Sequence, residues 1–338
     1  MKRKLFSATL CTLALLLLMG AGIQPSSAAP AIEEESTSAV KTEQVLETGI
    51  STGTEQNETA QTQDVAEQSS KENEETAAEA EVEIDAIEIP AMDPTFLIDG
   101  QPAHADTDRM WVKSVLYVAL KPTVRDLAPE AEYSWDSKTK TATVTTANLT
   151  LTAKVGNVYA VANGRYLYIQ NKIRMEGDQV YIPLKVLTQA FGAEQSYDAE
   201  TGIVQVCRGS GAILSGDQFY NKDKLFWLSR IIYAESGNQS LKGKMAVGNV
   251  IMNRVKSKKF PNSIVGVLSQ KNQFSTYQGG ALANRKPNQS SVIAAKLVLD
   301  GGVVAETRGA LYFDSLVNSW SSRNRTYLCK LGDHNFYR

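Results

Sequence analysis

The sequence predicts an α+β multidomain protein in which a duplicated mixed α/β module precedes a mainly α domain. Three observations predict this organisation. Residues 31–90 have a large excess of acids and almost no aromatic side chains, residues 92–208 repeat one pattern of short strands around a helix, and residues 220–338 show the apolar spacing of amphipathic helices. A chain of 338 residues is long enough for two domains with cores of ordinary size.

Residues 1–29 have the pattern of a secretory signal peptide. A basic start is followed by a Leu-rich run that is short for a bilayer span, and small residues stand at the expected cleavage site, Ala28-Ala29. We therefore expect an exported protein with no stable membrane span after cleavage. An uncleaved membrane anchor is the alternative.

Residues 30–91 are predicted to form a disordered acidic linker. Between residues 31 and 90, 17 acids stand against two lysines. Such a segment cannot bury enough apolar surface to offset the entropy lost on ordering. It is either a spacer that lets the following domains reach into a polymer network or an inert, solubilising leader.

The C-terminal part has the opposite charge. From residue 220 to the end, 18 lysines and arginines stand against six acids. A basic domain favours an anionic partner, and both nucleic acid and cell-wall polymer have that charge. Because the export pattern places the chain where wall polymer is abundant, we expect peptidoglycan as partner and no nucleic acid, with the protein secreted or in the cell wall.

Residues 92–208 contain an internal repeat with a spacing of about 64 residues that shrinks to 62. Each copy is predicted to run strand, turn, strand, helix, strand, turn, strand. The matching pairs are Asp99-Gly100 with Asn163-Gly164, Val118-Ala119-Leu120-Lys121 with Ile182-Pro183-Leu184-Lys185, and Ala131-Glu132-Tyr133-Ser134-Trp135-Asp136 with Ala193-Glu194-Gln195-Ser196-Tyr197-Asp198.

This repeated unit resembles the copper amine oxidase N-terminal-like domain of exported proteins. The Trp-Asp and Tyr-Asp turns and the Ile-Pro-Leu helix start are its most specific marks. The family name does not predict copper here, because His104 and Cys207 are too few ligands for an obvious site, and His104 is better interpreted as a surface residue. We expect a module that binds or positions the protein on the wall.

A predicted helix ends at Glu235. Leu225, Leu228, Ile231 and Ile232 lie on one helical face, and Glu235 continues that face before Gly237-Asn238 ends the helix. A carboxyl group at this position is partly desolvated and close to the negative end of the helix dipole, and both effects favour its protonated form. The pattern therefore favours a general acid, and a solvent-facing glutamate is the alternative.

The number of acids in this domain limits the reaction. The usual glycosidase routes need two carboxyl groups. Besides Glu235, the domain has Glu306 in an expected exposed helix end, and Asp314, which aromatic residues flank. A mechanism with one acid, in which Glu235 protonates the leaving oxygen and then accepts a proton from the 6-hydroxyl of the sugar, needs no second carboxylate. Lytic transglycosylation is this reaction. A muramidase or glucosaminidase that uses water, with Asp314 as partner, is the first alternative.

Residues 225–338 resemble the spore cortex-lytic, cell wall hydrolase family. The matching stretches are Ile232-Tyr233-Ala234-Glu235-Ser236, Met245 to Val255, Phe260-Pro261, Gln273-Phe274-Ser275, Gly309 to Phe313, and Gly332 to Tyr337. The resemblance implies a lysozyme-like fold related to lytic transglycosylases and cleavage between N-acetylmuramic acid and N-acetylglucosamine in spore cortex or vegetative wall. It also implies a role in germination or sporulation, with Glu235 as the catalytic glutamate.

Several polar and aromatic residues are candidates for binding N-acetyl sugars. Residues 240–256 form a predicted amphipathic helix with Asn253-Arg254 at its distal end, where Arg254 is expected to bridge structural elements. Residues 273–277 are expected to be extended, with Phe274 turned to the core. The candidate substrate-binding residues are Asn253, Gln273, Ser275, Tyr277, Tyr312 and His334, and Trp320 is a further aromatic that could stack on a sugar ring.

Other reaction classes have less support. A zinc amidase needs further ligands near His334, the only histidine of the domain, so we expect no metal and no cofactor. Cys329 has only His334 as a neighbouring base in sequence, which is weak evidence for a cysteine nucleophile. Cys207 and Cys329 allow at most one disulfide once Cys11 leaves with the signal peptide. A non-catalytic wall-binding protein is the alternative from another class, and the identity of any accessory regulator is left open.

Overall fold

The computed structural model describes residues 95–338. The predicted signal peptide, the acidic linker and Cys11 lie outside the described residues. Two hydrophobic cores divide this part of the chain, one built from residues 96–213 and the other from residues 228–336. Among residues 95–338, no helix combines the length and the apolar character that a membrane crossing requires.

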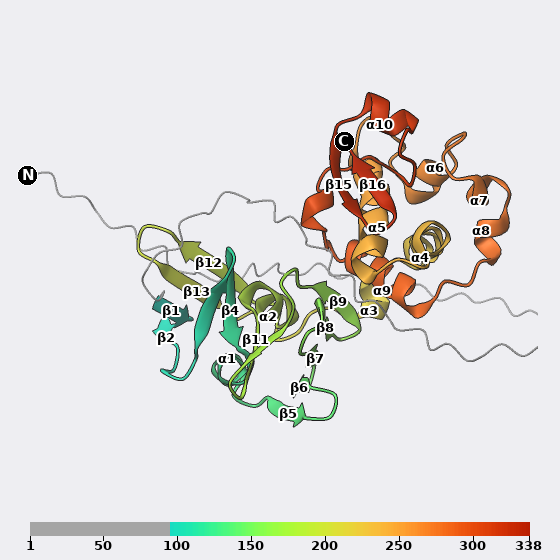
Figure 1. The fold of residues 1–338 in the computed structure, drawn as a ribbon. Coiled ribbons are helices and arrows are strands. Elements are labelled where there is room, and N and C mark those ends of the chain that lie inside the picture. Colours follow the sequence, from blue (N-terminus) through green and yellow to red (C-terminus); the bar gives the residue numbers. More distant parts are fainter. Residues whose placement is uncertain (1–94) are drawn as a thin grey trace, which may run out of the picture. The chain divides into compact units, whose positions relative to one another are not determined.

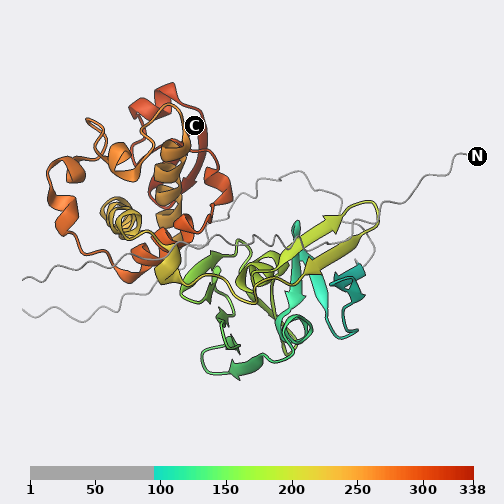
Figure 2. The same cartoon turned by 180° about the vertical axis from the view of Figure 1, so that it is seen from behind.

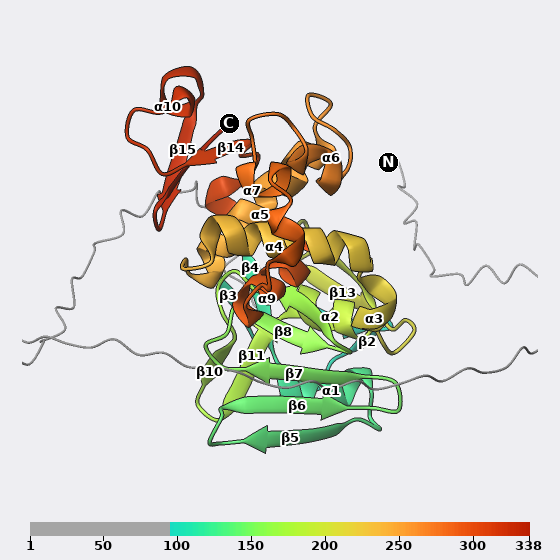
Figure 3. The same ribbon diagram turned by 90° about the vertical axis from the view of Figure 1, so that its right-hand side faces the viewer.

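The first core belongs to a module of three sheets and two helices (Figure 1). The sheets have the strand orders β12-β13-β1-β2, β10-β11-β4-β3 and β5-β6-β7-β8-β9. Figure 3 shows β5, β6 and β7 as neighbouring strands of the third sheet. The elements are β1 Thr95–Ile98, β2 Gln101–Pro102, β3 Arg109–Val112, β4 Val115–Ala119, α1 Leu120–Leu127, β5 Glu132–Asp136, β6 Thr141–Thr145, β7 Thr150–Lys154, β8 Tyr159–Ala162, β9 Arg165–Tyr168, β10 Arg174–Glu176, β11 Gln179–Pro183, α2 Leu184–Ala190, β12 Glu194–Asp198 and β13 Ile203–Cys207.

The same order of elements occurs in both halves of this module. A hairpin, a second hairpin, a helix and a third hairpin run from β1 to β6, and the same order runs from β8 to β13. The turn residues Asp99 and Asn163 both have φ 49°, and each is followed by a glycine with φ 77°, the left-handed pair that tight hairpins favour. Helices α1 and α2 begin at the matching residues Leu120 and Leu184.

The observed unit is longer than the predicted one. Each half has a second hairpin before its helix, formed by β3 with β4 and by β10 with β11, and β7 lies between the two halves. The β3–β4 turn contains no glycine and instead places Lys113 at φ 47°, so its sequence carries no strong turn signal.

The second core belongs to a domain of helices and one small sheet. Helices α4, α5 and α9 contact one another and bury their apolar faces, and β14, β16 and β15 pair in that order as an antiparallel sheet. Figure 1 looks nearly along the axis of α4, and Figure 2 looks along it from the other end. The elements are α3 Gly216–Phe219, α4 Lys222–Ser236, α5 Leu241–Lys256, α6 Ile264–Leu268, α7 Ser275–Gln278, α8 Ala281–Asn284, α9 Gln289–Leu299, η1 Ala305–Thr307, β14 Tyr312–Asp314, α10 Trp320–Asn324, β15 Tyr327–Leu331 and β16 His334–Tyr337.

A buried ion pair connects residues of the two cores. Asp300 follows α9, and its carboxylate accepts two hydrogen bonds from the Arg165 guanidinium, at 2.9 and 2.7 Å. The Tyr220 hydroxyl donates a further hydrogen bond to Asp300 at 3.1 Å. Because the side chains of Asp300 and Arg165 are only 1% and 10% exposed, each charge is neutralised out of contact with water.

Candidate active site

Helix α4 carries Glu235 in its last turn. Asn221 caps the start of the helix by accepting a hydrogen bond from the Lys224 backbone N–H, and Leu228, Ile231 and Ile232 are fully buried against the neighbouring helices. The helix ends at Ser236 and Gly237 follows as its C-cap, as the sequence predicts. Burial of this apolar stripe fixes the rotation of the helix and so the direction in which Glu235 projects.

Side chains hold the end of α4 in place. The Ser236 hydroxyl donates to the Ile232 carbonyl at 2.7 Å, which satisfies one of the last carbonyl groups of the helix. The Asn288 amide donates to the Gly237 carbonyl at 3.3 Å, while its own oxygen caps the start of α9. The backbone around Glu235 is therefore tied to a second helix.

Glu235 is half-buried, and desolvation by burial raises the pKa of its carboxyl group, with the Arg285 charge acting in the opposite direction. Of the carboxyl groups in residues 95–338 whose pKa is shifted, only that of Glu235 is shifted upward. Within the same residues, no side chain hydrogen bond stabilises its charged form. The predicted rise in pKa is present, and Arg285, which follows α8, is a neighbour that sequence reasoning missed.

His334, the first residue of strand β16, lies beside Glu235 of helix α4. Gln239 and Asp333 form two hydrogen bonds, from Gln239 Nε2 to Asp333 Oδ2 at 2.6 Å and from the Asp333 N–H to Gln239 Oε1 at 3.1 Å. These bonds tie the segment after α4 to the turn that leads into His334. Burial lowers the pKa of His334, and the charges of Asp333 and Asp314 and the backbone of Glu235 act in the opposite direction. The lowered pKa favours the neutral form of the imidazole beside the candidate acid.

Arg254 organises a second group of candidate residues. It is 4% exposed at the end of α5, and it donates to the Leu311 carbonyl at 2.7 Å and to the Gln273 side chain oxygen at 2.9 Å. Burial lowers its pKa to about 10. Asn253 donates to the Ala310 carbonyl at 2.9 Å. Arg254 thus bridges structural elements, and one hydrogen-bonding atom each of Asn253 and Gln273 is already occupied.

Aromatic rings lie beside this group. The Tyr312 ring centroid is 6.2 Å from that of Phe260 and 6.0 Å from that of Trp320, which is 54% exposed. The Arg325 guanidinium lies 4.7 Å from the Tyr312 centroid and 4.6 Å from the Trp320 centroid. Sequence reasoning missed Arg325, because nothing in its local pattern distinguishes it from other basic residues of this domain.

Residues 273–277 are not extended, so this prediction was wrong. Ser275–Gln278 form the short helix α7, and Gln278 also reaches back to the Gln270 carbonyl at 2.7 Å. Phe274 is buried as predicted, but Ser275 and Tyr277 do not share a face through strand alternation. The Tyr277 ring instead packs against Trp227 of α4, with 5.4 Å between centroids.

The described contacts bring the candidate residues together as two sets. His334 lies beside Glu235, whereas Asn253, Gln273 and Tyr312 surround Arg254. Ser275 is exposed on α7 beside Tyr277. Within residues 95–338 no hydrogen bond joins one set directly to the other.

Candidate metal ligands do not form a cluster in the part of the chain that the structure describes. Within residues 95–338, no three histidine, cysteine, aspartate or glutamate side chains gather closely enough to hold an ion. The His104 side chain is 69% exposed, and its Nδ1 lies 2.6 Å from Asp126 Oδ1, so it is a surface residue with a carboxylate partner. Cys329 carries a free thiol, and no disulfide joins it to Cys207.

Comparison with known proteins assigns both domains. Residues 238–337 match the family model "Cell Wall Hydrolase", and residues 97–206 match "Copper amine oxidase N-terminal domain". The first match begins three residues after Glu235, so it does not include the candidate acid. A spore cortex-lytic enzyme of Bacillus cereus is 31% identical over 121 residues, which are 35% of this chain and 45% of that protein. A spore cortex-lytic enzyme of Bacillus subtilis is 29% identical over 121 residues, 35% of this chain and 38% of that protein.

Two solved structures are also similar. The catalytic domain of the germination-specific lytic transglycosylase SleB from Bacillus anthracis is 29% identical, with a TM-score of 0.32, and the match covers 35% of this chain and 97% of that one. The catalytic domain of Bacillus cereus SleB is 28% identical, with a TM-score of 0.32, and the match covers 35% of this chain and 92% of that one. The chain spans less than half the length of the curated relatives it matches. It carries a cell wall hydrolase domain, preceded by a copper amine oxidase N-terminal-like domain.

Proposed function

We propose that the cell wall hydrolase domain cleaves the glycan strand of peptidoglycan between N-acetylmuramic acid and N-acetylglucosamine, with Glu235 as the proton donor. The raised pKa of Glu235 is the observation that carries this proposal, because protonation of a glycosidic oxygen near neutral pH requires a carboxylic acid that keeps its proton. The names of the relatives support the choice of polymer.

The proposed reaction is lytic transglycosylation. Glu235 donates its proton to the bridging oxygen, and the bond from that oxygen to C1 of the muramic acid residue breaks. The C6 hydroxyl oxygen of the same residue then bonds to C1, and its proton passes to the Glu235 carboxylate. The products are a free 4-hydroxyl and a 1,6-anhydro end, and the enzyme returns to its protonated state without water as a reactant.

The candidate substrate residues have definite parts in this proposal. Tyr312 and the exposed Trp320 offer ring faces to sugars, with Arg325 beside both. The Gln273 amide N–H₂ group, the Ser275 hydroxyl and the remaining amide capacity of Asn253 would bind N-acetyl and hydroxyl groups, and the hydroxyl of Tyr277, which lies on α7 with Ser275, would do the same. His334 would position the Glu235 backbone. A lysozyme-like fold for this domain and an origin of the preceding module by duplication belong to the same proposal.

Hydrolysis is the second candidate, and one observation favours it. Asp314 on β14 acts electrostatically on His334, the ring that also interacts with the backbone of Glu235. Asp314, like Asp333, therefore shares a neighbour with Glu235, and it would be the second carboxyl group that activates water. This reaction would leave a reducing end instead of an anhydro end.

Product analysis tests the proposal. The parent and Glu235→Gln would be incubated with purified sacculi and with purified cortex, and the soluble fragments analysed by mass spectrometry. Anhydromuramic ends from the parent and none from the variant are expected. Reducing ends in place of anhydromuramic ends would indicate hydrolysis instead of transglycosylation. Free peptides whose release a chelator stops would indicate an amidase. Binding without fragments from either protein would identify a non-catalytic wall protein and overturn the proposal.

The proposed organisation of the chain has four parts. We propose that residues 1–29 direct export, that residues 30–91 connect the signal to the first domain, and that residues 92–208 and 220–338 are the two functional domains. The protein would then act outside the cell, on vegetative wall or on spore cortex. The side-by-side substrates of the product analysis distinguish these two targets.

A further inference from the structure

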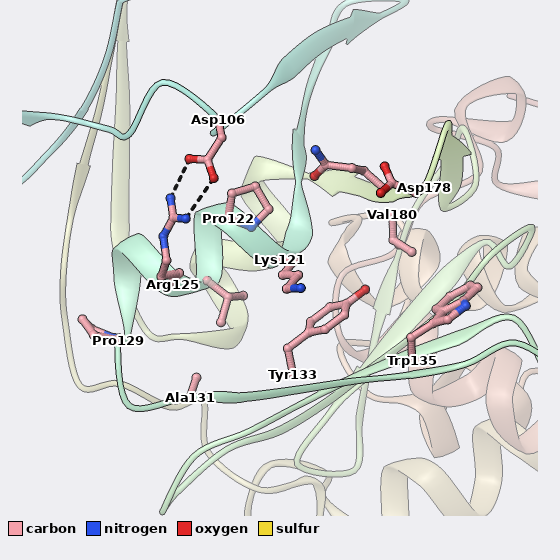
Figure 4. A pocket seen from close by; sticks show the side chains of 12 residues that line it. Asp106, Lys121, Pro122, Arg125, Pro129, Ala131, Tyr133, Trp135, Asp178 and Val180 are labelled. Carbon is pink, nitrogen blue, oxygen red and sulfur yellow. Dashed lines mark hydrogen bonds and ion pairs between the residues drawn. The ribbon is translucent and has the colours of Figure 1, made fainter.

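The copper amine oxidase N-terminal-like domain contains a cavity that the proposed reaction does not use. Its volume is about 700 Å³, within the range of about 300–1,000 Å³ in which proteins bind small ligands. Helix α1, strand β5 and the start of β11 form its walls (Figure 4). The side chains that matter for its chemistry are Asp106, Lys121, Arg125, Tyr133, Trp135 and Asp178.

Two aromatic rings form one wall of the cavity. Tyr133 and Trp135 are two residues apart on β5, so their side chains project from the same face of the sheet. Both are half-buried and packed against the core of the module, which holds their rings in place. Within residues 95–338, neither the Tyr133 hydroxyl nor the Trp135 indole N–H makes a hydrogen bond, so both polar tips can bind a ligand.

The charged groups around these rings balance. Arg125 donates two hydrogen bonds to Asp106, at 2.9 and 2.6 Å, and the dashed lines in Figure 4 mark this pair. Lys121 and Asp178 are the other two charged residues of the lining, and the Lys121 Nζ lies 5.7 Å from the centre of the Tyr133 ring. With two acids and two bases, the lining favours a neutral ligand over a polyanion or a polycation.

These features match the chemistry of a sugar ring. A pyranose has an apolar face that packs on an aromatic ring and an edge of hydroxyl groups that bind charged and polar side chains. The corresponding position in the other half of the module is different. Tyr197 of β12 corresponds to Trp135, but it is 42% exposed, its ring contacts Trp111 edge-on at 5.8 Å, and it is not part of this cavity.

We propose that the cavity between α1 and β5 is a second glycan-binding site, in which Tyr133 and Trp135 bind uncharged pyranose rings of the wall glycan. The identity of that glycan rests on the proposed function, whereas the site itself rests on the lining residues. A second site on the same chain raises the effective concentration of the catalytic domain at the polymer. The preceding module would therefore hold the enzyme on an insoluble substrate.

The test measures binding of the full chain with Glu235→Gln as background, so that digestion does not remove the polymer. Co-sedimentation with purified sacculi and titration calorimetry with the N-acetylglucosamine tetramer would compare Trp135→Ala with the matched control Tyr197→Ala. We expect Trp135→Ala to weaken binding at least about fivefold, as loss of a buried aromatic anchor does, and Tyr197→Ala to change it less than twofold. Equal affinities in the two variants would overturn the proposal.

A second variant keeps the test independent of folding. Lys121 is exposed at the rim, so Lys121→Trp would fill the cavity entrance without changing the core. It should weaken binding as Trp135→Ala does, and unchanged binding would count against the site. If a soluble stem peptide competes for binding to sacculi and the sugar tetramer does not, the assignment of the site to glycan is overturned. Because these assays measure binding alone, a parent that binds but does not lyse sacculi would reject the proposed reaction and leave this site standing.

Discussion

Glu235, which is half-buried, and Asp300, whose side chain is 1% exposed, both stand at the C-terminal end of a helix, yet their surroundings differ. Glu235 lies in the last turn of α4, within reach of the Arg285 charge but with no hydrogen bond to its carboxylate from residues 95–338. Asp300 is the C-cap of α9, and Arg165 and Tyr220 saturate its oxygens. Burial alone therefore does not produce the environment of a general acid. Burial without a compensating partner does, because the charged form of the carboxyl group is then not stabilised.

The largest expected effect is on the reaction. Glu235→Gln keeps the shape of the side chain and removes its proton, so release of soluble glycan from sacculi should fall at least about a hundredfold. Asp223→Asn, at the exposed start of the same helix, is the matched control and should keep the parental rate. In the parent, the rate should fall as pH rises through the raised pKa of Glu235. Lysis by Glu235→Gln at the parental rate would contradict the role of this residue.

The next effect concerns Asp300. Asp300→Asn leaves the Arg165 charge buried without its counterion and should lower the free energy of unfolding by about 3–5 kcal/mol, measured by urea denaturation. The double variant Asp300→Leu with Arg165→Met removes both charges and should recover most of this loss. If the single and double variants unfold at the same urea concentration, the unpaired Arg165 charge is not the cause of the lost stability.

A smaller effect concerns the pH dependence that Glu235 gives to the stability of the parent. Because the folded-state pKa of Glu235 is above its ordinary value, the folded protein holds a proton that the unfolded chain releases between the two values. Stability therefore falls as pH rises through this window. Glu235→Gln should show little change in Tm below the ordinary carboxyl pKa and a higher Tm than the parent above the raised pKa. The opposite sign at neutral pH would show that Glu235 has a stabilising partner.

The smallest effect is expected for Glu306, the other glutamate of the domain. Its carboxylate pairs with Lys242 at 2.6 Å, and the two side chains are 43% and 48% exposed. Water and salt screen such a pair, so Glu306→Gln should cost less than about 1 kcal/mol and leave lysis of sacculi unchanged. A large fall in the lysis rate, measured beside Glu235→Gln, would show that the reaction needs a second glutamate.

Local patterns predicted the parts of this protein that depend on neighbours in sequence. The helical face that ends in Glu235, its stop at Gly237, the hairpin turns at Asp99-Gly100 and Asn163-Gly164 and the burial of Phe274 all follow from periodicity or from turn chemistry. The helix α7 did not follow, because Ser275–Gln278 is too short for a helical period to stand out from an alternating one.

The sequence by itself determined that one glutamate would lie on the apolar face of a helix, because a period of 3.6 residues assigns faces without knowledge of the fold. Only the tertiary structure decided which charged groups face each acid. Arg165 reaches Asp300 across 135 positions of the chain, and Arg285 comes near Glu235 through the path of α8 and the segment after it. Electrostatic partners act through space and no local pattern specifies them, so the chemistry of the site depends on the folded chain.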